Sequence, residues 1–534
     1  MPADLIITDA NLWLGGRSRP GTMTIRDGRV SAVGIEAAAD HRGPATQVLS
    51  LPGRLVLPGF IDAHIHAPVG GDSLRRVYLN DAAGVDEYLR IVGDYADAHP
   101  DETWITGSGW ALEHFTDGTP TAAALDAVVP DRPVFLFNRD LHGAWVNSRA
   151  LAIAGIDATT PDPADGRIER LPDGSPIGML QEGAAYSFNS RHVPQPDRDS
   201  WQAAIRTAED HLFSLGVTSW QDAWVTPDTH AAYLAMDRAG TLRASVVGAL
   251  WWSRNRGLDQ IDEFLAQREA APSGRYAATT VKIMTDGIVE NRTAAMQEPY
   301  CGCQHDERGL TYVDRDLLAA AVTRLDAEGF SVHMHAIGDR AVRNALDAIQ
   351  AARRSNGAND LRHHIAHLQI VNPDDVPRFA ELGVVANCQP FWCQNEPQMD
   401  DLTLPVIGPE RAGWQYPFAA LRATGAALAG GSDWPVTTPD PLAEIDVMVN
   451  RWAPGHADAG AFMPEQRVPL AAAIDAFTRG SAFVNHTDDR LGALAPGMQA
   501  DFAILDHDPT TDPAATMSDA TVEYTVVRGR IVHS

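Results

Sequence analysis

The stretch LPGFIDAHIHAPVGG, from Leu57 to Gly71, decides how the rest of the chain is interpreted. An apolar run ends in His64 and His66, and glycines follow. Side chains two residues apart in a strand point to the same side, so we expect both imidazoles to face one way at the carboxyl end of a strand. Imidazole is the side chain that most often ligates metals. This pair alone leaves a packed or surface role equally open.

Seven further runs of β-forming residues follow along the chain, and alanine-rich segments typical of helices precede several of them. These runs are GVTSWQDA (216–223), RASVVGAL (243–250), VKIMTDG (281–287), FSVHMHAIGD (330–339), HHIAHLQIV (363–371), GVVANCQP (383–390) and AALAGGSD (426–433). Eight strands that alternate with helices predict an α/β fold, a (β/α)8 TIM-like barrel. The active site of such a barrel lies at the carboxyl ends of its strands.

The two ends of the chain differ from this middle part, because both consist of short strand-like runs broken by Gly, Asp and Asn. Neither end alone is long enough to cover a core. We therefore expect one small β-sandwich domain built from residues 1–56 and 485–534, and a barrel domain over residues 57–484. Residues 71–201 interrupt the strand–helix rhythm after the first barrel strand, and we interpret them as an insertion over the barrel mouth.

Charge and composition restrict the partners. The 534 residues carry a formal net charge of −28 and give an isoelectric point of about 4.9. Nucleic acids and anionic membranes both require a basic face, so we expect neither as a partner. The first residues lack the pattern of a signal peptide, and four cysteines in so long a chain do not form a disulfide framework. Of these, Cys301 and Cys303 are expected to be reduced thiols rather than metal ligands. We expect a cytoplasmic protein that acts on a small molecule.

Four more ionisable residues stand where predicted strands end: Lys282, His335, His367 and Asp433. A lysine inside an apolar strand is costly unless it is neutralised or paired. Each residue of the set could be a satisfied polar group in a barrel core. Together with His64 and His66, however, the set follows the order of the barrel strands and would close on one cavity. It suits one or two divalent cations.

Two of these residues, His335 and His367, have other histidines close to them in the sequence. His333 shares a face with His335 but lies deeper in its strand, so we choose the residue nearest the strand end. The same argument favours His367 over His363 and His364, and the family resemblance described below favours it more firmly.

The motifs also show a family resemblance. PGFIDAHIH, HAIGD and GSDWPV resemble the metal-dependent amidohydrolase superfamily, in its amidohydrolase-3 (YtcJ-like) branch. LHGAWVNSRAL, DGSPIGMLQEGA and the terminal GALAPGMQADFAILD are similar to the same branch, so the resemblance runs nearly end to end. One activity of this branch is the deformylation of N-substituted formamides. The resemblance also implies a homodimer.

The resemblance implies roles that spacing does not give. His64, His66 and Asp433 would hold a first metal ion, and His335 and His367 a second. Lys282 would bridge the two ions as a carboxylated lysine, and zinc is the metal we expect. The branch often has Glu directly before the sixth-strand histidine, whereas this chain has Ala366. That difference could alter the support of the ligand without abolishing metal binding.

These observations predict an enzyme that hydrolyses a carbon–nitrogen bond other than a peptide bond. A metal-activated water would attack the carbonyl, with Asp433 as general base and then general acid. The substrate would be an amide, N-substituted formamide or carbamate with a hydrophobic substituent. One alternative is non-hydrolytic chemistry on the same barrel, by a decarboxylase, isomerase or lyase. A non-enzymatic binding protein is a third.

Large aromatic and polar residues near the predicted strand ends are candidates for the substrate pocket. For each of them, packing in the core is an equally good interpretation. Asp286 receives no catalytic role, since a turn explains it. The candidates for substrate binding are Trp110, His142, Glu182, Gln389, Phe391, Trp392 and Trp434, with Trp251 and Trp252 as further aromatics.

Overall fold

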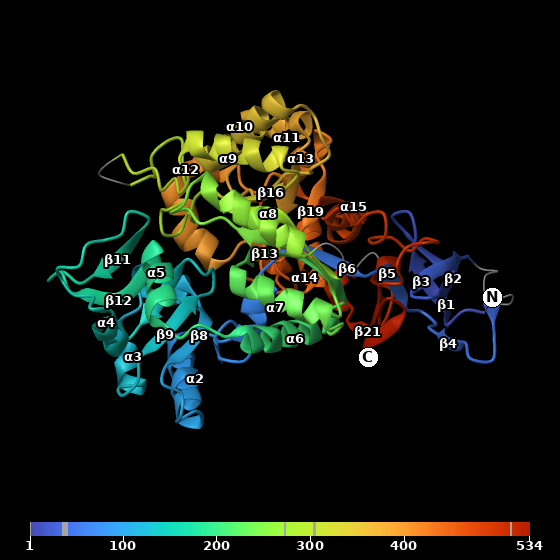
Figure 1. The fold of residues 1–534 in the computed structure, drawn as a ribbon, viewed down its shortest axis with the longest axis horizontal. Coiled ribbons are helices and arrows are strands. Elements are labelled where there is room, and N and C mark those ends of the chain that lie inside the picture. The colour runs from blue at the N-terminus through green and yellow to red at the C-terminus, as the bar shows by residue number, and fades with distance from the viewer. Residues whose placement is uncertain (1, 35–40, 272–273, 303–305, 513–514) are drawn as a thin grey trace.

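The computed structural model describes residues 2–34, 41–271, 274–302, 306–512 and 515–534, so Cys303 lies outside the described residues (Figure 1). Its centre is a sheet of eight strands in which every neighbouring pair is parallel. The predicted barrel is confirmed, and each of the eight predicted runs overlaps one of its strands. The strands are β6 (Phe60–Ile65), β13 (Val217–Val225), β14 (Ser245–Trp251), β15 (Tyr276–Met284), β16 (Ser331–Ala336), β17 (His364–His367), β18 (Val385–Cys388) and β19 (Leu428–Gly430).

The segment that follows β19 closes the sheet into a barrel. Asp433 donates its backbone N–H to the carbonyl oxygen of His64 at 2.7 Å, and His66 donates to the carbonyl oxygen of Trp434 at 2.9 Å. The residues after the last strand therefore pair with the end of the first strand, and this pairing brings Asp433 beside the two histidines.

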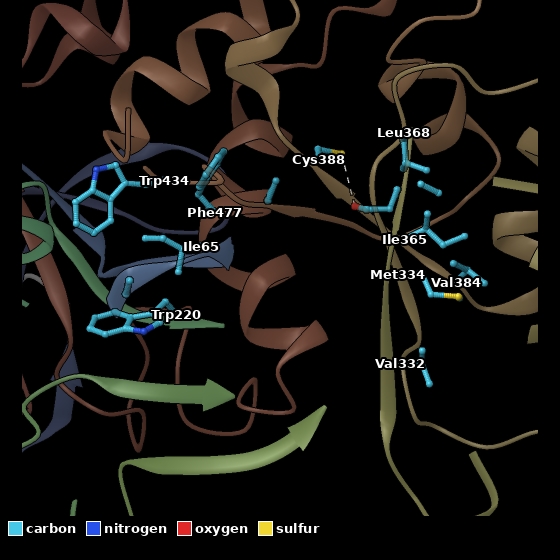
Figure 2. Close-up of a cluster of buried hydrophobic side chains, with 14 of the residues drawn as sticks. Ile65, Trp220, Val332, Met334, Ile365, Leu368, Val384, Cys388, Trp434 and Phe477 are labelled. Atoms are coloured by element: carbon cyan, nitrogen blue, oxygen red, sulfur yellow. Dashed lines mark hydrogen bonds between the residues drawn. The ribbon is translucent and has the colours of Figure 1, made fainter. Parts of the chain in front are cut away.

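Alternation along the strands separates the barrel interior from its outer core. In β16, Val332 and Met334 belong to the outer core (Figure 2). His333 and His335 alternate with them along the strand and therefore point to the other side. Ile65 of β6 and Trp220 of β13 belong to the same outer core. The strand period of two thus places apolar side chains outside and polar ones inside.

Helices surround the barrel, each with one apolar face on the sheet. In α10, the buried residues Val342, Ala345, Leu346 and Ile349 recur every three or four positions, which is the spacing of one helix face. The main covering helices are α6 (Arg198–Ser214), α7 (Pro227–Arg238), α8 (Ile261–Ala270), α9 (Arg315–Ala327), α10 (Asp339–Asn356), α11 (Val376–Leu382), α13 (Phe418–Ala423) and α14 (Pro441–Asn450).

A second eight-stranded sheet is built from both ends of the chain, as predicted. Val56, Phe502 and Ile504 face a small core of its own, whereas Leu57 and Ala503 face the core that it shares with the barrel. The exact domain boundaries predicted from the sequence stay predictions. The strands of this sheet are β1 (Leu5–Trp13), β2 (Ser18–Arg26), β3 (Arg29–Val33), β4 (Gln47–Ser50), β5 (Leu55–Pro58), β20 (Phe502–Leu505), β21 (Val522–Val527) and β22 (Arg530–His533).

The insertion after the first barrel strand forms a third sheet, on the side of the barrel away from the sheet of the chain ends (Figure 1). Its strands are β7 (Val77–Tyr78), β8 (Ile105–Trp110), β9 (Val134–Asn138), β10 (Gly143–Val146), β11 (Gly166–Arg170) and β12 (Pro176–Glu182), packed with α2 (Val85–Ala98), α3 (Ala122–Val128), α4 (Ser148–Ala154) and α5 (Gly183–His192). Among the described residues, none of the helices has the length and apolarity needed to cross a membrane.

Candidate metal centre

The six predicted ligands line one cavity at the carboxyl ends of the barrel strands. His64 lies in β6, Lys282 in β15, His335 in β16 and His367 at the end of β17, and Asp433 follows β19. The cavity has a volume of about 40 Å³. The structure therefore brings together all six residues that the sequence singled out: His64, His66, Lys282, His335, His367 and Asp433.

Asp433 is at the centre of this group. Its Oδ1 lies 3.0 Å from His64 Nε2 and 2.9 Å from His66 Nε2. Ligand atoms of His64, His367 and Asp433 all lie within 4.8 Å of one another. Burial raises the pKa of Asp433, but His64 and His66 outweigh burial and hold that pKa well below its ordinary value. Asp433 is therefore an anion among buried imidazoles.

Unpartnered atoms test whether these residues fit a cation. Asp433 Oδ1 and His367 Nδ1 are both buried, and neither has a hydrogen-bond partner of proper geometry. Buried polar atoms in proteins are nearly always hydrogen-bonded, so unpaired atoms that lie together in one cavity indicate an additional ligand. Imidazole nitrogen and carboxylate oxygen are donors that suit Zn²⁺ and related divalent ions. The residues present fit a divalent metal ion.

Lys282 lies in the same cavity and is only 1% exposed. Its Nζ is 3.5 Å from His64 Nε2. Burial lowers the pKa of Lys282 to about 7, although the charge of Asp433 opposes the shift. A large part of this amine is thus neutral near neutral pH, which removes the cost of burying an ammonium group among metal ligands.

The backbone is strained at two of the candidate ligands. His367 has φ 76° and Asp433 has φ 62°, a left-handed conformation that residues other than glycine seldom adopt. Gln389 helps to hold the first of these, because its Oε1 accepts the backbone N–H of His367 at 2.7 Å. Such strain persists where the surroundings enforce it, and it is common at functional sites.

Two buried carboxylates support the ligands from behind. Asp286 Oδ1 lies 3.1 Å from His335 Nδ1, and the same carboxylate accepts three backbone N–H groups. Asp62 accepts the hydroxyl of Ser432 at 2.6 Å and the N–H of His64 at 2.9 Å. Carboxylates behind metal-ligating histidines fix the ring orientation. Asp286 therefore has a supporting role that its turn-like sequence context does not show.

His142 reaches the cavity from the insertion. Its Nδ1 lies 3.0 Å from Oε1 of Glu182, which is fully buried. Burial lowers the pKa of His142, but the charge of Glu182 outweighs it and raises that pKa to about 9. Burial likewise raises the pKa of Glu182, whereas His142 lowers it to about 2. The pair places a cationic imidazole in the wall of the cavity.

Aromatic rings form the remaining wall. Trp392 stacks on the ring of His367 with 5.0 Å between centroids and 8° between planes. Trp224 lies between Trp251 and Tyr186, with centroid distances of 5.1 and 6.0 Å. Sequence reasoning named Trp392 and Trp251 but missed Tyr186 and Trp224. Position on a strand end was the available signal for Trp224, which lies near the end of β13.

Four predicted pocket residues lie near the cavity without lining it. Glu182 holds His142, and Gln389 holds the backbone of His367. Phe391 lines an adjoining cavity instead. Trp434 directly follows Asp433, but its ring points outward onto Gly70, where a Cβ would lie 2.4 Å from the ring.

Trp110 and Trp252 are not brought to the site either. Trp110 packs with Phe115 and Trp145 in the core of the insertion and donates its indole N–H to the carbonyl oxygen of Leu136. Trp252 is 2% exposed in the outer core of the barrel. Both large rings are used for packing, which is their commonest role.

Comparisons with known proteins agree with this geometry. A sequence model of the amidohydrolase family matches residues 47–533. The chain is 28% identical to the putative amidohydrolase YtcJ of Bacillus subtilis over 98% of this chain and 99% of that protein. It is 26% identical to the N-substituted formamide deformylase of Arthrobacter pascens over 98% of this chain and 97% of that protein.

Among solved structures, an uncharacterized metal-dependent hydrolase from Pyrococcus furiosus superposes with a TM-score of 0.71 at 26% identity, covering 95% of this chain and 99% of that one. The family match spans far more than half of the chain, and it includes the barrel that carries the ligand cluster. The chain therefore belongs to the amidohydrolase family and is a metal-dependent hydrolase of that family, which acts on carbon–nitrogen bonds.

Proposed function

We propose that the protein hydrolyses N-substituted formamides that carry a hydrophobic group on nitrogen, releasing formate and an amine. His64, His66 and Asp433 would hold one divalent ion, and His335 and His367 a second. We propose zinc, because a histidine-rich set with one carboxylate is typical of zinc hydrolases. When bound, such an ion polarises a carbonyl oxygen and lowers the pKa of water.

Lys282 would join the two ions as a carboxylated side chain. Its lowered pKa, about 7, supports this role, because only the neutral amine adds to carbon dioxide. The addition forms a nitrogen–carbon bond and releases one proton, so the product is an anionic carbamate. An anion at this place would suit the position of Lys282 among the histidines better than an ammonium group would.

The small volume of the cavity is the observation that carries the choice of formamides. About 40 Å³ is room for roughly three water molecules, given about 10–15 Å³ for one. Tyr186, Trp224, Trp251 and Trp392 limit its expansion. Formyl is the smallest acyl group, and each added methyl group on the acyl side would press against this aromatic wall.

The substituent on nitrogen has more space available. A cavity of about 230 Å³ adjoins the ligand cavity, sharing Leu141 and Trp224 with it. Phe135, Phe137 and Trp201 line this second cavity. Apolar rings favour an apolar substituent, since burying its surface stabilises the complex by about 25 cal/mol per Å².

Two side chains would handle protons and charge in the reaction. Asp433, an anion at the centre of the ligands, would take a proton from the attacking water and deliver it to the leaving nitrogen. His142, held cationic by Glu182, would face the carbonyl oxygen and stabilise the negative charge that develops on it. The similarity to a formamide deformylase agrees with this assignment.

A paired substrate panel tests the proposal. Formate and amine release would be measured for N-alkyl and N-arylalkyl formamides and for the matching acetamides. We expect kcat/KM to favour the formamide of each pair by about 10–200-fold, the usual cost of one methyl group in a tight pocket. Phe137→Ala should raise KM for arylalkyl formamides but not for N-methylformamide. Phe391 lines a different cavity, so Phe391→Ala should leave the KM of both kinds of formamide unchanged. Equal rates for formamides and acetamides would refute the assignment.

Metal content tests the ligand set separately. Elemental analysis of freshly purified protein, without added metal or chelator, should give close to two zinc ions per chain. One ion per chain would remove the bridging role of Lys282. A chain that holds none and rebinds none would refute the whole ligand set.

A further inference from the structure

A chain of buried polar side chains runs from His64 away from the metal cavity. His333 Nε2 lies 2.9 Å from His64 Nδ1, and His333 Nδ1 lies 2.6 Å from Oε1 of Gln221. All three residues are at most 1% exposed. The nitrogen of His64 that faces Asp433 is the other one, Nε2. The chain therefore contacts His64 on the side opposite the metal cavity.

Gln221 lies at a junction of this chain. Its Oε1 is also 2.8 Å from Nε2 of His364, and its Nε2 donates to Oδ1 of Asn485 at 2.6 Å. The contacts of one amide thus join strands β13, β16 and β17 to the residue that follows α16 (Ser481–Val484). A side chain with three specific partners in a dry interior holds each of them in a defined orientation.

The orientation of the Gln221 amide decides which nitrogen of His64 carries the hydrogen. A neutral imidazole carries one N–H, so one nitrogen donates and the other accepts. Gln221 Oε1 only accepts, so His333 must donate from Nδ1. Its Nε2 is then an acceptor and takes the hydrogen of His64 Nδ1. His64 Nε2 is left with a free lone pair, and this is the atom that lies beside Asp433.

The reversed amide would have the opposite result. Its NH₂ group would donate to His333 Nδ1, His333 would donate from Nε2, and His64 would accept on Nδ1 and carry its hydrogen on Nε2. That hydrogen would block metal ligation. The reversed amide would also suit His364, whose Nδ1 lies 3.1 Å from the carbonyl oxygen of Arg362 and could then donate to it. Metal binding and His364 therefore favour opposite orientations of Gln221.

We propose that Gln221 is a positioning residue for the metal centre, which acts through His333 to fix the tautomer of His64 so that Nε2 is presented to the metal ion. The inference rests on the proposed role of His64 as a ligand. It requires that Gln221 offer an acceptor, and not merely fill space, between His333 and His364.

Zinc affinity of the metal-free chain tests the proposal, measured by competition with a chromophoric chelator at fixed pH. Gln221→Met keeps the length of the side chain but removes the acceptor, and we expect zinc binding to weaken by about 10–100-fold, as for other residues that orient a metal ligand. Gln221→Glu keeps only acceptors and should bind zinc within about threefold of the native chain. Asn485 can support this variant by turning, because its Nδ2 has no hydrogen-bond partner among the described residues.

His364→Phe is the matched control, because it removes another partner of Gln221 without breaking the chain to His64. We expect it to bind zinc at least as tightly as the native chain, since it removes the group that favours the reversed amide. Native affinity in Gln221→Met, or equal losses in Gln221→Met and His364→Phe, would overturn the proposal. Failure of the native chain itself to bind zinc would instead refute the ligand set.

A measurement on the native chain keeps the test decisive if a variant does not fold. In zinc-loaded protein labelled with ¹⁵N-histidine, correlation spectra through the ring protons report which nitrogen carries the hydrogen. The His333 signal, assigned by its loss in His333→Gln, should show the hydrogen on Nδ1. A hydrogen on Nε2 of His333 would overturn the proposal.

Discussion

Removing the charge of Glu182 should move the pH range in which the protein is stable and active. Glu182 is fully buried, and its Oε1 lies 3.0 Å from Nδ1 of His142. Glu182→Gln keeps the shape of the side chain and removes the anion that holds His142 protonated. Burial then lowers the pKa of His142 against only the weaker effects of Asp140 and Asp433, so this pKa should fall well below 9.

The size of the effect is worked from the raised pKa of His142, about 9, and the ordinary value of histidine, 6.5. Raising the pKa of His142 from 6.5 to about 9 corresponds to about 3 kcal/mol of stabilisation. Because the folded pKa lies above the unfolded one, this stabilisation is complete below pH 6.5 and is lost as the pH rises through 9. At pH 8, about nine-tenths of His142 is protonated with a pKa of 9 and about 3% with a pKa of 6.5, a roughly thirtyfold difference.

Two assays follow this prediction. Urea unfolding of the native protein from pH 6 to 10 should show stability falling above pH 7, and Glu182→Gln should be less stable at pH 6 and lack that fall. The alkaline limb of kcat/KM for the best formamide should lie at a lower pH in the variant than in the native protein. Metal content of both proteins is the control. Coincident alkaline limbs at equal metal content would refute the role given to His142.

Other predictions concern the ligands and the core. Asp433→Asn should keep the fold, seen by circular dichroism, and lower kcat by at least about 10²–10⁴-fold, the usual contribution of a general acid–base group; near-native turnover would contradict the mechanism. Gly431→Ala should reduce zinc per chain, because its Cβ would lie 2.6 Å from the backbone nitrogen of His64; Gly257→Ala, with only one ordinary contact, is the control. Trp220→Ala should lower the free energy of unfolding by about 3–5 kcal/mol in urea denaturation, and a loss under 1 kcal/mol would show that the outer core repacks.

The barrel could be predicted from the sequence because the period of two in its strands and the spacing of three or four in its helices are both local patterns. Short apolar runs with polar ends marked all eight strands, and their order placed His64, Lys282, His335 and Asp433 at one end of the barrel. These positions depend only on the sequence of each strand and on the parallel order of the strands around the barrel. The homodimer and the cytoplasmic location stay predictions.

The rest depends on contacts between distant segments. Trp434 follows a candidate ligand, yet its ring leaves the cavity and packs against Gly70, which is distant in the sequence. Trp110 and Phe391 could not be placed, because the direction of a large ring depends on the register of the insertion and of the loops. Gln221 has its partners 112, 143 and 264 residues away, and a glutamine inside a strand carries no local sign of such a junction.

The pairing of β5 with β20 has a consequence for how the protein is made. Leu57 pairs with Ala503, and only Gly59 separates β5 from β6, the strand that carries His64. During synthesis, this edge of β5 therefore stays unpaired until β20 has left the ribosome. Unpaired edges favour aggregation, and pairings so distant in sequence form slowly. A chain that stops before Phe502 would lose the strand that pairs with β5, directly before the segment that carries His64 and His66.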